Sequence, residues 1–184
     1  AYQGFSKGLR EDAVAIGALV DAGIDTFIVT SSYSKSFSLY GERVGALSIV
    51  TQTKDESARV LSQLKRVIRT NYSNPPTHGA QLVATVLADA ELRSVWEEEL
   101  SGMRLRIQQV RGQLVEYLRV AGVDDMGFIA EQRGMFSYSG LTKDQMVRLR
   151  EEFAVYGTDA GRICVAAVNS GSVEYVANAI AAVR

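Results

Sequence analysis

One lysine of this chain lies in surroundings that are unusual for its residue type. Lys35 follows shortly after an apolar, β-branched segment at residues 26–30, with hydroxyl side chains close by at Ser31, Ser32 and Ser34. Lysine normally stays on a solvated surface, whereas an amine held in a cleft becomes a nucleophile that forms a Schiff base with an aldehyde. The hydroxyls can donate hydrogen bonds to phosphate oxygens. The alternative interpretation is a polar loop with a solvated lysine.

Three arginines add groups that can bind anions. Arg43 lies eight residues after Lys35, at the start of a second apolar run, and its planar fork suits bidentate phosphate binding. Arg69 lies near the end of a predicted helix, where a cation also interacts favourably with the helix dipole. Arg162 precedes the apolar residues 163–166, and an arginine in such a place is more often simply solvated.

Other kinds of chemistry have little support in the sequence. His78 and Cys164 are the only histidine and cysteine, so we expect no metal site of the usual zinc type and no internal disulfide. The glycines form no Gly-x-Gly-x-x-Gly pattern after a strand, which argues against dinucleotide binding. The formal net charge of −1 argues against nucleic acid as a partner. No apolar run reaches the roughly 20 residues that span a bilayer, so we expect no membrane partner.

The elements that must position these residues alternate along the chain. The pattern predicts helices at residues 11–22, 54–69, from about 79, 91–121, 142–153 and 172–183, and strands at residues 26–30, 44–50, 128–130, 135–138 and 162–167. The strand at residues 26–30 is expected to be buried because it is uniformly apolar and β-branched. The helix at residues 91–121 carries one apolar stripe, and Thr142 with Gln145 has the spacing of a capping box. This alternation indicates an α/β fold, with two regions that meet near Gly102 inside the long helix.

Several segments, in the right order, carry a family resemblance. They are residues 31–35 (SSYSK), 39–45 (LYGERVG), 1–5 (AYQGF), 68–76 (IRTNYSNPP), 134–137 (GMFS) and 161–166 (GRICVA). These segments resemble the aspartate aminotransferase subfamily of the fold type I enzymes, which depend on pyridoxal 5′-phosphate (PLP). The first two resemble its PLP-lysine segment, the fourth its substrate-arginine segment, and the last two its small-domain substrate segments. The resemblance covers the whole chain.

The resemblance implies roles toward the cofactor for four residues. Lys35 would bind PLP covalently and, once released by substrate, would move a proton at the substrate Cα as a general acid and base. Ser32 and Arg43 would bind the cofactor phosphate. Tyr2 would donate a hydrogen bond to the phenolic oxygen of the cofactor.

Three further residues would bind substrate. Arg162 would clamp the α-carboxylate with two parallel donors. Arg69 would reach into the active site of the neighbouring subunit and pair with a distal carboxylate. Phe136 would line the side-chain pocket.

The resemblance therefore implies a cytoplasmic, homodimeric enzyme with a shared active site that acts on amino acids and 2-oxo acids. Residues 162–169 (RICVAAVN) resemble the aromatic branch slightly more, which favours transamination between an aromatic amino acid and 2-oxoglutarate. Aspartate aminotransferase is the alternative. A non-catalytic, aminotransferase-like effector-sensing domain of a regulator is an alternative of another class, but the complete set of Lys35, Arg43, Arg69 and Arg162 favours an enzyme.

The first residue raises a further expectation. Residues 1–5 resemble the stretch just after the aspartate that pairs with the pyridine nitrogen in this subfamily. We therefore expect residues 1–101 to be the C-terminal part of the large PLP-binding domain and residues 102–184 to be the small α/β domain. Without the aspartate the cofactor is a poorer electron sink, so we expect the 184-residue chain alone to be inactive.

Overall fold

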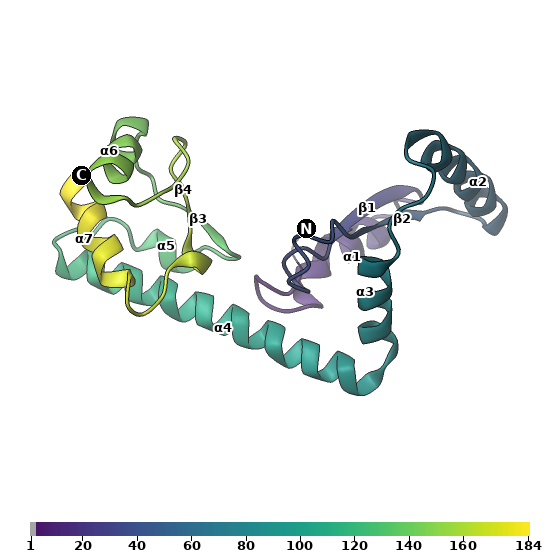
Figure 1. Cartoon of the computed structure of the whole chain (residues 1–184), viewed down its shortest axis with the longest axis horizontal. Helices are drawn as coiled ribbons and strands as arrows, with labels where there is room; N and C mark the ends of the chain where they lie inside the picture. Colours follow the sequence, from purple (N-terminus) through teal and green to yellow (C-terminus); the bar gives the residue numbers. More distant parts are fainter. Residues whose placement is uncertain (1–2) are drawn as a thin grey trace. The chain divides into compact units, whose positions relative to one another are not determined.

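A computed structural model describes residues 3–184, which form two compact units (Figure 1). Unit 1 comprises Gly8–Leu100 together with Gln3 and Gly4, and unit 2 comprises Ser101–Arg184 together with Phe5–Lys7. The division falls inside the long helix α4 (Ala90–Val120). That these units correspond to the large and small domains implied by the resemblance stays a prediction.

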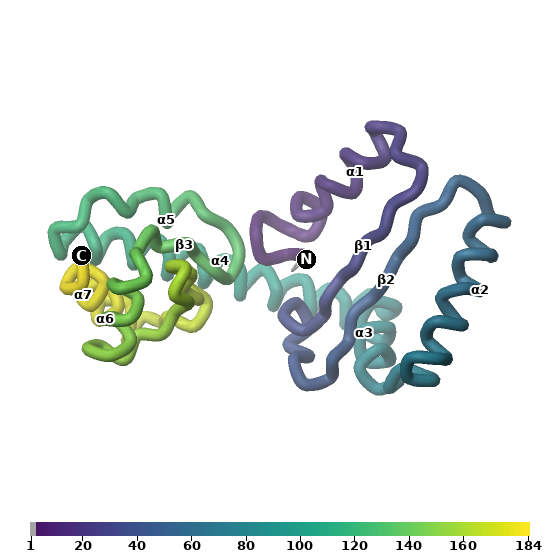
Figure 2. The backbone as a smooth tube through the Cα atoms, turned by 90° about the horizontal axis from the view of Figure 1, so that it is seen from above, coloured from purple at the N-terminus to yellow at the C-terminus, as the bar shows by residue number. Residues whose placement is uncertain are grey.

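Unit 1 is built around a β-hairpin. A 3-10 turn at Glu11–Ala13 leads into α1 (Val14–Asp21), followed by β1 (Phe27–Ser32), β2 (Gly45–Val50), α2 (Lys54–Asn71), α3 (His78–Ala88) and the first part of α4. The two strands run antiparallel, with Phe27 opposite Val50 and Ser32 opposite Gly45 (Figure 2). A side chain at Gly45 would place its Cβ 2.6 Å from the carbonyl oxygen of Ser31, so only glycine fits at this end of the ladder.

The expectation that residues 26–30 form a buried strand is wrong for the described residues. Ile28 is 64% exposed, and Leu47 on the paired strand is 51% exposed. The sheet formed by the described residues of unit 1 has two strands only, and the packing within residues 3–100 leaves more than half of each of these two side chains accessible. An apolar strand has side chains that can be buried, but the surface that buries them need not belong to the same stretch of chain.

Unit 2 packs helices against a small hairpin. After the second part of α4 come α5 (Phe128–Glu131), β3 (Phe136–Tyr138), α6 (Lys143–Phe153), β4 (Arg162–Cys164), a 3-10 turn at Val165–Ala167 and α7 (Val173–Val183). The core of this unit consists of fully or nearly fully buried apolar side chains: Phe5, Ile107, Val110, Leu114, Leu118, Met126, Ile129, Leu141, Met146, Leu149, Ile163, Val165, Val173, Ala177, Ala179, Ile180 and Val183. The stripe predicted on the long helix supplies four of them.

The local signals for helices are confirmed in both units. Thr142 caps α6 through a complete capping box with Gln145, so this helix begins where the spacing predicts. In α2 the Thr53 side chain accepts a hydrogen bond from the Glu56 amide. Gly122 has a φ of +86° just after α4, the left-handed conformation in which helices commonly end.

No helix in residues 3–184 combines the length and apolar character of a bilayer span.

Two strand predictions in unit 2 are wrong. The strand expected at residues 128–130 is the helical turn α5, in which only Ile129 is buried. A run of three apolar residues cannot distinguish a strand from one turn of helix. The strand expected at residues 162–167 ends at Cys164, because Val165–Ala167 forms a 3-10 turn. There the Ala166 amide donates to the Met135 carbonyl, 3.2 Å away, and so ties the turn to the segment before β3.

We expect the core of unit 2 to be sensitive to truncation on one side of α4 only. Leu114 is fully buried, whereas Leu105 on the same helix is 58% exposed. Leu114→Ala should lower the free energy of unfolding by about 2–5 kcal/mol, because it removes transfer free energy and leaves a cavity. Leu105→Ala, the matched control, should change it by less than about 1 kcal/mol. Urea unfolding measures both, and equal losses would contradict this packing.

Candidate functional site

The loop between β1 and β2, residues 33–44, is called the lysine loop below. Lys35 is half-buried and lies between Ser34 and Ser36, which are both buried. The Ser34 amide donates to the Ser32 hydroxyl oxygen over 3.3 Å, so the loop leaves the strand in a tight turn. The Lys35 Nζ lies 3.4 Å from the centroid of the Tyr40 ring. This cation–π contact holds the amine within the loop.

Arg43 closes the lysine loop from its other end. Its backbone is left-handed, with a φ of +52°, which is uncommon for a residue other than glycine. Its Nη1 donates to the Tyr40 carbonyl oxygen over 3.0 Å and lies 3.5 Å from the Ser34 hydroxyl. Strained backbone conformations of this kind persist where the surroundings determine them, often at functional sites. The guanidinium and the lysine amine thus share one neighbour, Tyr40, whose carbonyl oxygen accepts from Arg43 and whose ring lies against the amine of Lys35.

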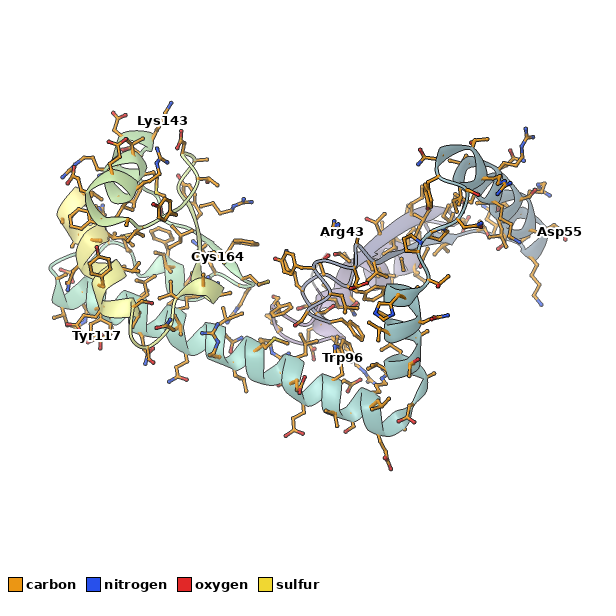
Figure 3. The ribbon with its side chains drawn as sticks, in the orientation of Figure 1. Arg43, Asp55, Trp96, Tyr117, Lys143 and Cys164 are labelled. Carbon is orange, nitrogen blue, oxygen red and sulfur yellow. The ribbon has the colours of Figure 1, made fainter. Side chains whose placement is uncertain are left out.

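Two helices of unit 1 fix the loop. Trp96 lies on α4 (Figure 3). Its ring stacks on Phe37 with centroids 4.6 Å apart, and its Nε1 donates to the Ser36 carbonyl oxygen over 2.6 Å. On α3, Gly79 is buried, and a Cβ there would lie 3.1 Å from the Cβ atoms of Glu42 and Val44. The loop is held at one end by the close approach of α3 and at the other end by the stacked Trp96. Such support from rigid elements is what a preorganised binding site requires.

This arrangement provides an amine next to anion-binding donors. Lysine supplies a nucleophile for an aldehyde, while hydroxyls and a guanidinium supply donors for a phosphate. The structure places the predicted residues Lys35 and Arg43 in the lysine loop and the predicted residue Ser32 at the end of β1, directly before it. The loop also includes Ser34, whose hydroxyl the sequence suggested as a phosphate donor, and Tyr40, which was not predicted as a site residue. The predicted residue Tyr2 lies outside the described residues.

Arg69 stands apart from the lysine loop. It is exposed near the C-terminal end of α2 and donates a hydrogen bond to the Ser73 hydroxyl. No hydrogen bond among residues 3–184 joins it to the lysine loop. An exposed arginine near a helix end is compatible both with a solvated side chain and with a group that reaches toward another chain.

The predicted substrate residues of unit 2 lie together on its hairpin. β3 and β4 pair antiparallel, with Phe136 opposite Cys164 and Tyr138 opposite Arg162. Since side chains alternate along a strand, Phe136 and Arg162 share one face. The Arg162 Cζ lies 5.0 Å from the centroid of the Phe136 ring, a cation–π contact. The opposite face carries Ser137, which is 2% exposed and looks into the core.

Among residues 3–184, histidine, cysteine, aspartate and glutamate side chains form no group of three that could hold a metal ion. His78 is exposed at the first position of α3, and Cys164 is half-buried with its thiol free.

Comparison with known proteins adds a family to this geometry. The model of the family "Aminotransferase class I and II" matches residues 1–180. The chain belongs to the class I and II aminotransferases. It spans less than half the length of the aminotransferases it matches, at 45–46% for those described below.

Aminotransferases with two kinds of names are similar to the chain. The aspartate aminotransferase of Pseudomonas aeruginosa is 60% identical over 98% of the chain and 45% of its own length. The aromatic-amino-acid aminotransferase of Escherichia coli is 50% identical over the whole chain and 46% of its own length. The crystal structure of the aromatic-amino-acid aminotransferase from Burkholderia pseudomallei, covalently bound to pyridoxal phosphate, is 62% identical with a TM-score of 0.94, over the whole chain and 46% of that protein. The α/β fold is thus that of the aminotransferases, while both substrate classes occur among the relatives.

Proposed function

We propose that Lys35 of this aminotransferase binds PLP and that the full-length protein transfers the amino group of an amino acid to a 2-oxo acid. The observation that carries the proposal is the lysine loop, where the amine of Lys35 and the guanidinium of Arg43 both contact Tyr40 and the guanidinium also lies beside the hydroxyl of Ser34. A cofactor with one aldehyde and one phosphate needs this combination of groups. PLP, when bound, supplies an electron sink for the bonds at the substrate Cα.

The residues of the lysine loop then divide the work. Ser32 and Arg43 bind the phosphate, with the hydroxyl of Ser34 as a third donor beside Arg43. Lys35 anchors the cofactor and, when its amine is released, accepts and returns the proton at the substrate Cα. A lysine amine can do this acid–base work when a short tether holds it close to the carbon. The contact with Tyr40 keeps it within that reach.

Arg162 and Phe136 form the substrate side of the proposal. The guanidinium of Arg162 binds the α-carboxylate that all amino acid substrates share. Arginine contacts aromatic rings and pairs with carboxylates through its in-plane donors, so the contact with Phe136 and the bond to substrate do not compete. Phe136 also presents an apolar surface to the substrate side chain.

The substrate class proposed is an aromatic amino acid together with 2-oxoglutarate. The similarity to the Burkholderia pseudomallei aromatic enzyme supports this class. The similar identity to the Pseudomonas aeruginosa aspartate enzyme supports aspartate as the second candidate. We further propose a cytoplasmic homodimer in which Arg69, exposed on α2, enters the active site of the other subunit. Turnover of phenylalanine and aspartate with 2-oxoglutarate by the full-length protein tests the activity, and we expect about 1–10³ s⁻¹ for the better substrate.

Arg69→Ala tests how a distal carboxylate is recognised. We expect kcat/KM for aspartate to fall by roughly 10- to 100-fold, since a hydrogen bond to a charged group contributes about 1.5–3 kcal/mol. The value for phenylalanine should change by less than about threefold, because its side chain offers no partner to the arginine. Arg66→Ala, which removes another exposed arginine of α2, is the control and should leave both values unchanged. Equal losses for the two amino acids in Arg69→Ala would contradict the role of Arg69.

A further inference from the structure

Unit 2 contains a buried arginine that none of the roles above uses. Arg111 lies on α4 within the apolar stripe, one turn after Ile107 and nearly one turn before Leu114, and is 2% exposed. Its Nη1 donates to the Ser137 hydroxyl over 2.6 Å and to the Ile129 carbonyl over 3.3 Å. Its Nη2 donates to the Gly134 carbonyl over 2.6 Å, with the Phe136 carbonyl 3.4 Å away.

The charge of Arg111 has no carboxylate to balance it among these partners. Burial lowers the pKa of Arg111, and the nearby positive charge of Arg133 lowers it further, yet a guanidinium stays protonated in proteins. A buried charge is costly unless it is well hydrogen-bonded, and an apolar side chain of similar volume often replaces it without loss of stability. An apolar residue would fill the stripe as well as Arg111 does, so packing does not explain the arginine. Its hydrogen bonds do, because they hold the acceptor groups in place.

The acceptors of Arg111 lie on α5, on the segment that leads into β3, and on β3 itself. Gly134 has a φ of +82°, so the chain turns there, and Arg111 binds the carbonyl at the turn as well as the hydroxyl at Ser137. Ser137 pairs with Ile163 in the middle of the hairpin. Fixing Ser137 on the inner face therefore fixes which side chains emerge on the outer face, and these include Phe136 and Arg162. A one-residue slip of β3 would turn Phe136 to the inner face and separate it from Arg162.

We propose that Arg111 is a positioning residue for the Phe136–Arg162 pair: it locks the segment Gly134–Ser137 to α4 and thereby sets where the substrate carboxylate is bound. The proposal rests on the substrate-binding role proposed for Arg162. Arg111 itself is not expected to contact substrate, since it lies on α4, against the inner face of the hairpin.

Kinetics of three variants in the full-length protein test the inference. Arg111→Met keeps the side-chain volume without the donors, and Arg111→Lys keeps the charge without the fork that serves both sides of the segment. Arg119→Met is the matched control, because Arg119 lies on the same helix but makes only an exposed ion pair with Glu116. We expect KM for phenylalanine and aspartate alike to rise on the order of 10- to 100-fold in Arg111→Met, as misplacement by about 1 Å can cost 10²-fold. The kcat at saturation and the cofactor absorbance should stay near wild type, and Arg111→Lys should recover part of the KM.

Hydrogen exchange followed by mass spectrometry separates positioning from stability. In Arg111→Met, peptides covering residues 134–139 and 162–164 should exchange faster, while peptides from α6 and α7 keep their wild-type rates. Exchange and KM equal to those of Arg119→Met, or faster exchange throughout unit 2 with unchanged KM, would overturn the inference. Faster exchange confined to residues 134–139 and 162–164, with an unchanged KM, would show that the position of Arg162 does not matter for substrate binding. It would overturn the inference as well. If the wild-type protein shows no turnover, the proposed function fails, while local exchange still decides whether Arg111 locks the segment.

Discussion

Lys35→Ala is expected to abolish transamination in the full-length protein and to remove the absorbance of the bound cofactor. Acid–base catalysis alone accounts for about 10²–10⁴-fold in rate, and the same substitution removes the covalent anchor of the cofactor. Lys35 is half-buried between Ser34 and Ser36 and contacts Tyr40. It is the only lysine of the lysine loop, so no other side chain of the loop can replace its amine. The remaining activity should therefore be several orders of magnitude below wild type, measured as turnover of the better amino acid with 2-oxoglutarate.

Lys54→Ala is the matched control for this substitution. Lys54 is exposed at the first position of α2 and should be replaceable without effect on turnover or absorbance. An added small amine that restores part of the turnover of Lys35→Ala would support the acid–base role directly. Full activity of Lys35→Ala, or equal losses in the two lysine variants, would refute the assignment of Lys35.

Arg162→Lys is expected to weaken turnover of every amino acid substrate. The loss should be similar for phenylalanine and aspartate, because both substrates present the same α-carboxylate and lysine cannot form the bidentate fork. We expect kcat/KM to fall by roughly 10- to 100-fold for each, from the loss of about 1.5–3 kcal/mol of charge-assisted hydrogen bonding. Binding of the cofactor should be unaffected, since the contacts of the lysine loop described above all lie in unit 1.

Arg119→Lys provides the control for Arg162→Lys, because it makes the same chemical change on an exposed ion pair of α4. Both amino acids should then be turned over as in wild type. A loss in Arg162→Lys confined to aspartate would contradict the role of Arg162, because it would place the distal carboxylate, and not the shared one, at this residue.

Much of the fold could be predicted because its signals are local. The capping box at Thr142 involves residues three positions apart, and the stripe on α4 repeats every three or four residues, so neither depends on distant parts of the chain. The lysine loop was predictable for the same reason, since its groups lie within a dozen residues of one another. The contact of Phe136 with Arg162 could be expected only through the family resemblance, because the two residues belong to different strands.

The features that the sequence did not predict depend on what packs around a segment. Ile129 is fully buried in a helical turn, although the three apolar residues around it fit a strand equally well. The exposure of Ile28 reflects which surfaces cover a strand, and the strand's own residues do not contain that information. The burial of Arg111 could not be predicted from its residue type, because a charged residue normally lies at a solvated position. Its place between Ile107 and Leu114 in the stripe was the available signal.

The central claim, that Lys35 holds PLP, is tested most directly by reducing the full-length protein with borohydride and mapping its peptides by mass spectrometry. Reduction makes the bond between amine and cofactor permanent, so the labelled residue identifies the anchor. We predict a pyridoxyl group on Lys35 at close to one per chain, with none on the other lysines. A label on Lys7, Lys54 or Lys65, or no label on a protein that turns over substrate, would contradict the account.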